Sequence, residues 1–470
     1  MAVTRRGFAF SALAFAGCKG GAFSIVSGKR PPRLVCGVLS DVHVDKEDNA
    51  KAFRNALEWF RAEHVDAVVI AGDLTTDSTL KEFDWMARVY FSVFPRGRHL
   101  DGTPVERLFV TGNHDVDVLQ KFKSREEAEE KSFTFHRSET WERLFEEEYL
   151  PITRKDVKGV PFVLKNWCCR KLKEKSPVKA YFEKFSATLP HEGPLFYIQH
   201  DHPRGTCSWP GAKDCCDSGD TTECLSKYHD AIALSGHSHF SIANETSIWQ
   251  GAFTSVGTGS TCGWGFTDGG RENGHGGADL KDRMWEMPYL DILRCRQAQI
   301  MRVYDDCVAF ERRDVEFGLS LGVDRIVPLG AGAQRPYAFQ TRASKATPPQ
   351  FADNASGQVR IVPNGRDRAG NVHAQVVVEF PPVNGLNGGV RAYDYHIEAD
   401  ECLADGSYLH ILSRDVYSHN ALLPAEKDID TCACAIALSN LPRGKIRFKV
   451  EPRGEWGETG RALFIDFANS

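Results

Sequence analysis

The sequence predicts an α/β domain followed by a small all-β sandwich. Short apolar runs alternate with segments of helical spacing over most of the first two thirds of the 470 residues. The last quarter shows period-2 alternation without helical segments, which is typical of a sandwich. Between these parts, residues 331–356 are rich in Gly, Pro, Gln, Ser and Thr, as linkers are.

The α/β domain begins with a strand, helix, strand, helix, strand pattern. Residues 34–39, 67–71 and 107–110 are short apolar runs, as expected of strands buried on both faces. Residues 48–63 and 80–94 have apolar side chains at helical spacing. Such connections are right-handed and give a parallel sheet, whose carboxyl edge is where ligands bind.

The remainder of this domain is less regular. Residues 120–175 are highly charged, and we expect a helix in their middle. Residues 262–277 are too rich in glycine to form core structure. Five further runs are predicted strands, the last three of them antiparallel: residues 195–199, 231–234, 288–293, 299–303 and 308–312.

The C-terminal sandwich is predicted from its turn residues and alternating runs. Residues 445–452, followed by Gly454 and Gly457, resemble the last hairpin of a fibronectin type III-like module. The predicted strands are residues 359–361, 372–380, 390–397, 408–413, 432–438 and 445–450. We place the segment boundaries at 1–17 for an export signal, 33–328, 329–357 for the linker, and 358–470 for the sandwich.

The first residues resemble an export signal. Arg5 and Arg6 precede a modestly apolar stretch, in the manner of a twin-arginine signal, and residues 15–18 resemble a lipoprotein cleavage box. We expect residues 1–17 to be removed and Cys18 to carry a lipid, giving a periplasmic or cell-envelope lipoprotein of a bacterium. This anchor is the only membrane contact we expect, because no later run reaches the ~18 apolar residues of a transmembrane helix. A chance arginine pair before a disordered start is the alternative.

Polar clusters follow the predicted strands of the first domain, each at a carboxyl end. One such residue after a strand is usually a helix cap or a surface group, but five clusters in order indicate a shared site. Two divalent ions ~3.5–4 Å apart need a bridging carboxylate, and neutral imidazoles can complete each coordination sphere. The clusters are Asp41-Val42-His43, Gly72-Asp73, Gly112-Asn113-His114-Asp115, His200 and Gly236-His237-Ser238-His239.

This set of motifs resembles the calcineurin-like metallophosphoesterases, over approximately residues 33–315. The resemblance implies a four-layer α/β/β/α sandwich that holds two metal ions and hydrolyses phosphate esters with a metal-bound hydroxide. It also implies a role for each residue, with Asp41, His43 and His239 binding one ion, Asn113, His200 and His237 binding the other, and Asp73 bridging them. His114 would contact the phosphate and protonate the leaving group, and Asp115 would orient His114. Imidazole, carboxylate and amide ligands suit manganese, iron or zinc.

The sequence identifies candidate substrate-binding residues less specifically than it identifies the metal ligands. His202 and Arg204 follow His200 directly and are candidates for binding the phosphate or its substituent, although both are equally typical of an exposed loop. The aromatic residues Trp209, Trp264 and Phe266 could stack on a base or sugar, or pack under a loop. We expect a phosphomonoester or phosphodiester of a nucleotide, a phospholipid head group or another small molecule, with a slight preference for diesters.

Composition excludes some partners. The 58 Lys and Arg against 63 Asp and Glu give a net charge of −5, and loss of Arg5 and Arg6 gives 56 − 63 = −7. A mildly acidic chain is not expected to bind a nucleic-acid duplex, and any attraction for phosphate should come from the metal ions. By their spacing, the 14 cysteines take no part in the site. Several lie in loops, where export would permit disulfides and a structural metal is an alternative.

The sequence also allows a function of another class, that of a binding protein. The C-terminal sandwich could be the functional part of a cell-surface protein that recognises glycans or proteins, with the metal domain as its scaffold. The complete set of metal-ligand motifs favours the enzyme. The sequence does not indicate an oligomeric state.

Overall fold

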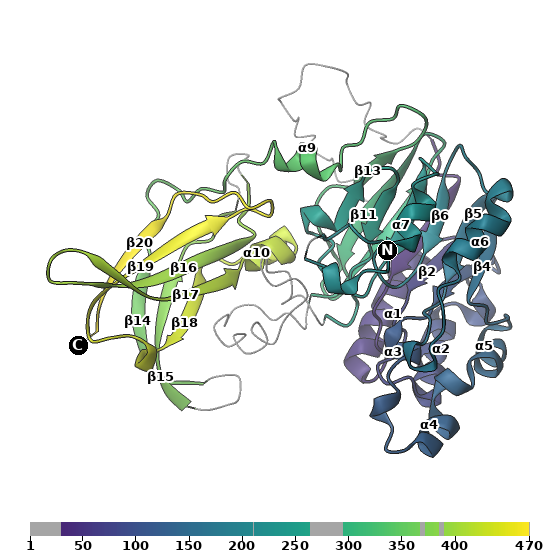
Figure 1. The fold of residues 1–470 in the computed structure, drawn as a ribbon, viewed down its shortest axis with the longest axis horizontal. Coiled ribbons are helices and arrows are strands. Elements are labelled where there is room, and N and C mark those ends of the chain that lie inside the picture. The colour runs from purple at the N-terminus through teal and green to yellow at the C-terminus, as the bar shows by residue number, and fades with distance from the viewer. Residues whose placement is uncertain (1–29, 210, 264–294, 367–371, 385–389, 470) are drawn as a thin grey trace, which may run out of the picture.

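The computed structural model describes residues 30–209, 211–263, 295–366, 372–384 and 390–469. Within them, an α/β domain built on two sheets is followed by a part made of antiparallel sheets (Figure 1). The predicted fold class is confirmed. The described helices include none with the length and apolar character needed to span a bilayer. The predicted signal, Cys18, the strand at 288–293, Trp264 and Phe266 lie outside the described residues.

The first sheet has the strand order β12-β11-β10-β1-β2-β3, with β13 also pairing with β11. Its β1, β2 and β3 are parallel, whereas β10 runs antiparallel to β1. Its strands are β1 (Leu34–Leu39), β2 (Ala67–Ala71), β3 (Glu106–Val110), β10 (Gln297–Val303), β11 (Cys307–Asp314), β12 (Leu319–Ser320) and β13 (Arg325–Pro328).

The second sheet has the order β4-β5-β6-β7-β9-β8, and β5, β6, β7 and β9 are parallel. The hairpin of β4 and β5 was not predicted from the charged segment in which it lies. Its strands are β4 (Ile152–Val157), β5 (Val160–Lys165), β6 (Leu195–Ile198), β7 (Ala231–Ser235), β8 (Ile248–Gln250) and β9 (Thr254–Gly257).

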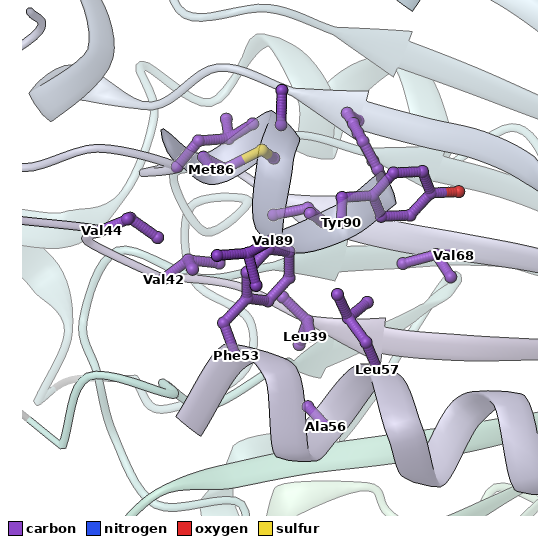
Figure 2. Packing of buried hydrophobic residues seen from close by; sticks show 14 of the residues in the cluster. Leu39, Val42, Val44, Phe53, Ala56, Leu57, Val68, Met86, Val89 and Tyr90 are labelled. Carbon is purple, nitrogen blue, oxygen red and sulfur yellow. The ribbon is translucent and has the colours of Figure 1, made fainter. Parts of the chain in front are cut away.

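Helices cover the outer faces of both sheets. Buried residues from both sheets form one core between them, and two further cores lie under the helices, so the layers run α/β/β/α. In Figure 2, Phe53 and Leu57 of α1 and Val89 and Tyr90 of α2 surround Leu39 of β1. The helices of this domain are α1 (Glu47–Ala62), α2 (Leu80–Val93), α3 (Asn113–Val116), α4 (Arg125–Lys131), α5 (Arg137–Phe145), α6 (Val178–Phe185) and α7 (Asp220–Leu225).

Local sequence explains where the two long helices begin. Glu47 and Asp48 place negative charge in the first turn of α1, where the helix dipole favours it. At α2, the Thr79 hydroxyl accepts from the backbone N–H of Glu82 (3.2 Å), and the Glu82 carboxylate accepts from the N–H of Thr79 (3.0 Å). This capping box satisfies two donors that a helix start leaves unpaired.

The C-terminal part packs a sheet of order β14-β15-β18 against one of order β17-β16-β19-β20 around an apolar core. Its strands are β14 (Gln358–Arg366), β15 (Val372–Phe380), β16 (Asp394–Cys402), β17 (Tyr408–Tyr417), β18 (Cys432–Ala437), β19 (Gly444–Arg453) and β20 (Leu463–Asn469). Two short helices, α9 (Phe339–Ala343) and α10 (His419–Leu422), lie before and within it.

The sandwich contacts the first domain directly. Glu455, after β19, accepts hydrogen bonds from the backbone N–H groups of Glu245 (2.5 Å) and Thr246 (2.7 Å). The Gln297 side-chain amide donates to the Leu422 carbonyl of α10 (3.1 Å), and a small apolar cluster joins Cys295 to residues of the sandwich. Figure 1 shows α10 on the side of the sandwich that faces the α/β domain.

Candidate metal centre

The carboxyl ends of strands from both sheets meet at one place. Asp41 follows β1, Asp73 follows β2, Asn113 begins α3 directly after β3, and His200 follows β6. His237 and His239 follow β7. Asp41 and His200 are fully buried, and Asp73 and His239 are at most 5% exposed. Parallel packing therefore brings into contact side chains that lie nearly 200 residues apart.

The backbone at this edge is unusual. Asp41, His43, Asp73, His237 and His239 all have positive φ angles, between 46° and 68°. Left-handed backbone costs a non-glycine residue of order 1–3 kcal/mol and is found at functional sites. The first two turns are held by backbone hydrogen bonds from Asp41 to the carbonyl of residue 72 (3.0 Å) and from His43 to the carbonyl of Asp73 (3.1 Å).

Two glycines of the motifs are required by close packing. A Cβ at Gly72, whose φ is +93°, would lie 2.3 Å from Nδ1 of His200. A Cβ at Gly236 would lie 2.4 Å from Oδ2 of Asp41. The glycines in Gly-Asp and Gly-His-x-His thus let strand ends approach the neighbouring ligand side chains.

The ligand atoms form two groups that share one carboxylate. Asp41, His43, Asp73 and His239 offer atoms that all lie within 4.8 Å of one another, and so do Asp73, His200 and His237. Asp73 belongs to both groups, and this is the position that a ligand bridging two ions would occupy. These buried Asp and His groups are consistent with a centre for two metal ions.

Individual distances support the same arrangement. Nε2 of His239 lies 3.0 Å from Oδ1 of Asp41, and Nε2 of His43 lies 3.5 Å from Oδ2 of Asp73. Nε2 of His200 lies 3.1 Å from Oδ2 of Asp73 and 3.1 Å from Oδ1 of Asn113. Buried Nε2 of His43 has no hydrogen-bond partner, although such atoms are nearly always satisfied. A metal ion at this point would be its partner.

Electrostatics favour cations here. Burial lowers the pKa of His43 to about 3, so its imidazole is neutral and able to ligate. Although burial opposes ionisation, His239 and His200 lower the pKa of Asp41 to about 2. Burial lowers the pKa of His200, but the Asp73 carboxylate outweighs it and raises that pKa to about 9. A proton on His200 therefore balances Asp73, and metal ions would displace such protons on binding.

His114 and Asp115 differ in their surroundings. Nδ1 of His114 donates to the Thr76 carbonyl (2.8 Å), which leaves Nε2 for the site. Asp115 was expected to orient His114, but its carboxylate instead accepts from Leu74 (3.1 Å), Thr75 (2.9 Å) and the N–H of residue 112 (2.8 Å). Asp115 faces the backbone of the neighbouring loop because it occupies the third position of α3, where a carboxylate bonds the N-terminal backbone.

The predicted substrate contacts lie in different places. His202 is buried, and its Nδ1 and Nε2 bond the hydroxyls of Ser235 (2.7 Å) and Ser238 (2.8 Å), which occupies both ring nitrogens. Arg204 is exposed on its loop, and Trp209 is half-buried.

Two residues beside the second ligand group were missed. The ring of Trp167, which follows β5, lies 5.4 Å from that of His237 and 5.7 Å from that of His200. The guanidinium of Arg170 lies over the Trp167 ring at 4.8 Å. Arg170 thus stacks on a ring that lies beside the second ligand group. Neither β5 nor the contact of Trp167 with the histidines was predicted, because the segment before residue 175 was interpreted as charged and helical.

One cysteine also reaches the centre, contrary to the expectation from spacing. His43, His239 and Cys262 offer ligand atoms within 4.8 Å of one another. The 13 cysteines in the described residues form no disulfide with one another, so none of the loop disulfides considered above is present there.

Residues 35–241 match the family model described as calcineurin-like phosphoesterase. No curated protein matches the sequence significantly. Similar solved structures include a dimetal phosphatase from Danio rerio, with 12% identity, a TM-score of 0.38, and coverage of 64% of this chain and 100% of that one. Another is GAP50, the anchor in the inner membrane complex of Plasmodium, with 10% identity, a TM-score of 0.38, and coverage of 66% and 93%.

Proposed function

We propose that this chain, whose residues 35–241 form a calcineurin-like phosphoesterase domain, hydrolyses phosphate esters with two bound divalent metal ions. The observation that carries the proposal is the pair of buried ligand groups that share Asp73. Their charges support it, because the ion-pair partners of Asp41 and Asp73 among the described residues are imidazoles rather than lysine or arginine side chains. A centre of this kind attracts a phosphate once cations are bound.

The residues have separable roles in this reaction. Asp41, His43 and His239 would hold one ion, Asn113, His200 and His237 the other, and Asp73 both. Bound divalent ions would lower the pKa of water and offset charge on the phosphoryl oxygens. The carbonyl of Ala71 accepts from Nδ1 of His200 (2.8 Å), which turns the Nε2 lone pair toward the second ligand group.

His114 would complete the reaction as a general acid. Its ring is fixed by the bond from Nδ1 to Thr76, and the side chain is half-buried, so a substrate can reach it. A proton on Nε2 would pass to the departing alkoxide as the bond to phosphorus breaks. Ring contact with His43, at 4.8 Å, places His114 beside the first ligand group.

The substrate would be a phosphomonoester or phosphodiester, with diesters slightly preferred, and a nucleotide or phospholipid head group suits the site. Arg170 and Trp167 support a substrate that carries an anionic or planar group next to the phosphate. The metals would be manganese, iron or zinc, according to the ligand types.

The cellular location of the protein and the identity of its C-terminal module are proposed as well. We propose export through residues 1–17, attachment of a lipid at Cys18, and a fibronectin type III-like module over residues 358–470. The strand orders β14-β15-β18 and β17-β16-β19-β20 support a module of that kind.

Metal dependence tests the proposed function. Purified protein, stripped by a chelator and reloaded with Mn²⁺, Fe²⁺ or Zn²⁺, should hydrolyse activated phosphomonoesters or phosphodiesters only when reloaded. A panel of nucleotide diesters, monoesters and phospholipid head groups then ranks substrates by kcat/KM. Equal rates before and after stripping, or no hydrolysis with any metal, would contradict the proposal.

A further inference from the structure

The thiol of Cys262 lies against the metal-binding histidine His239. Sγ of Cys262 is 3.5 Å from Nδ1 of His239, and both side chains are about 95% buried. The other ring nitrogen, Nε2, lies 3.0 Å from Asp41 and faces the first ligand group. The two nitrogens of this imidazole therefore have distinct partners.

Ligation of an ion through Nε2 would determine which ring nitrogen of His239 carries the proton. A neutral imidazole that ligates an ion through Nε2 must carry its proton on Nδ1, and this N–H needs an acceptor. In most protein metal sites the acceptor is a carboxylate, a carbonyl or a water. Here the atom in that position is the sulfur of Cys262.

Cys262 is held in place by the same loop that carries Asp41. Its backbone N–H donates to the carbonyl of Asp41 (3.2 Å), and the N–H of Thr261 donates to the carbonyl of Ser40 (3.4 Å). The Ser260 hydroxyl donates to the Asp41 carbonyl (3.2 Å) and lies 3.2 Å from Sγ of Cys262. These bonds fix the sulfur relative to Asp41 as well as to His239.

We propose that Cys262 is a positioning residue of the metal centre, whose sulfur accepts the Nδ1–H of His239 and thereby directs Nε2 toward the ion held with Asp41 and His43. This inference rests on the metal centre of the proposed function. It makes one of the two metal sites depend on a thiol, whereas Nδ1 of His200 in the other bonds the backbone carbonyl of Ala71.

Metal binding without turnover tests this role. Full-length protein is stripped of metal and titrated with Co²⁺, with absorbance and calorimetry as readouts. Cys262→Ala is expected to weaken one of two Co²⁺ equivalents by roughly 10–100-fold, as loss of such hydrogen-bond partners does. Cys262→Ser retains an acceptor and should bind within about threefold of the unaltered protein, which is the rescue that a packing role would not show.

A matched control separates this effect from loss of any buried thiol. Cys207 is also buried and contacts a histidine, His202, which is not a ligand. Cys207→Ala should leave both Co²⁺ equivalents unchanged, and thermal unfolding of each metal-free variant checks that it folds.

Three results would overturn the inference. Unchanged Co²⁺ affinity in Cys262→Ala removes the role altogether. A sulfur-to-cobalt charge-transfer band in the unaltered protein, lost in Cys262→Ser, makes Cys262 a direct ligand instead. No Co²⁺ binding by the unaltered protein removes the metal centre and so the proposed function, whereas the first two results leave that function standing.

Discussion

The α/β domain and the C-terminal sandwich both pack two sheets around an apolar core, but they treat buried charge differently. In the sandwich, Asp394 is 2% exposed and bonds Arg453 through both oxygens (2.7 and 2.9 Å), so the two charges cancel. In the α/β domain, Asp41 and Asp73 are buried among histidines. Every group of potential metal ligands found in the described residues lies in that domain. The two-sheet architecture that both regions share therefore does not by itself create a metal site. A metal site needs buried carboxylates whose charge is not already balanced by a lysine or arginine.

The two regions are nevertheless coupled. Glu455 of the sandwich bonds residues 245 and 246, which lie six and seven positions after His239. Gln297 accepts from the N–H of Ile242 (2.9 Å) and donates to Leu422 of the sandwich. The sandwich therefore supports the segment that follows the Gly-His-x-His motif.

The largest effects are expected when one buried carboxylate in each region is neutralised. Asp73→Asn removes the shared charge and should lower kcat/KM by about 10³-fold or more, because several kcal/mol of transition-state stabilisation depend on the two ions. Asp394→Asn should leave kcat/KM nearly unchanged but lower the free energy of unfolding by roughly 1.5–3 kcal/mol, the worth of hydrogen bonds to a charged group. Kinetics and denaturant unfolding of both variants measure this.

These paired variants control for each other. Full activity in Asp73→Asn would remove the proposed mechanism. A large loss of activity in folded Asp394→Asn would show that the sandwich takes part in the chemistry.

His114 should matter most for poor leaving groups. His114→Ala removes the proton donor and is expected to lower kcat by roughly 10²-fold or more for an alkyl ester. The loss should shrink for a nitrophenyl ester, whose leaving group needs no proton, and a series of esters measures the trend. His229→Ala is the control, because the His229 ring bonds the neighbouring Asp230 and belongs to neither ligand group. Equal losses across the series would assign His114 another role.

Glu455 tests the coupling between the two regions. Glu455→Ala removes three hydrogen bonds to residues 245 and 246 and should lower the free energy of unfolding by about 1–2 kcal/mol, since the carboxylate is half-buried. We expect kcat to fall only a few-fold, because the metal ligands themselves remain. Glu451→Ala is matched to it, since Glu451 pairs with Lys449 inside the sandwich.

Deletion of the sandwich tests the same coupling between the two regions. Deletion from Gln358 onward would expose Cys295 and Phe317, which pack against the sandwich, and should lower both stability and activity. Unchanged activity in the truncated chain would mean that the sandwich is an independent module, as the binding-protein alternative requires.

Much of this arrangement was predictable from short-range pattern. Apolar runs located β1, β2 and β3, and parallel strands bring their carboxyl ends together, so Asp41, Asp73 and Asn113 could be grouped. The β4 strand was missed because only Val157 of its six residues is buried and four of the six are polar, which hides the alternation. Cys262 was missed for a different reason. Its place depends on bonds to Ser40 and Asp41, about 220 positions away, and spacing along the chain carries no sign of them.

The smallest effect expected concerns the pH dependence of stability, which should have opposite signs in the two regions. Burial raises the pKa of Asp314, at the end of β11, to about 7. The native state therefore keeps a proton that the unfolded chain loses above pH 4, and stability falls as pH rises from about 4 to 7. Asp314→Asn should flatten this fall, whose slope cannot exceed the ~1.4 kcal/mol per pH unit that one proton allows. In the sandwich, the hydrogen bond from Arg447 holds the pKa of exposed Asp466 below its usual value, so its small contribution is present at neutral pH and lost in acid. Unfolding free energies of Asp314→Asn and Asp466→Asn from pH 3 to 8 measure both slopes. Parallel difference curves would contradict the contrast between a carboxylate buried without a cation and one paired at the surface.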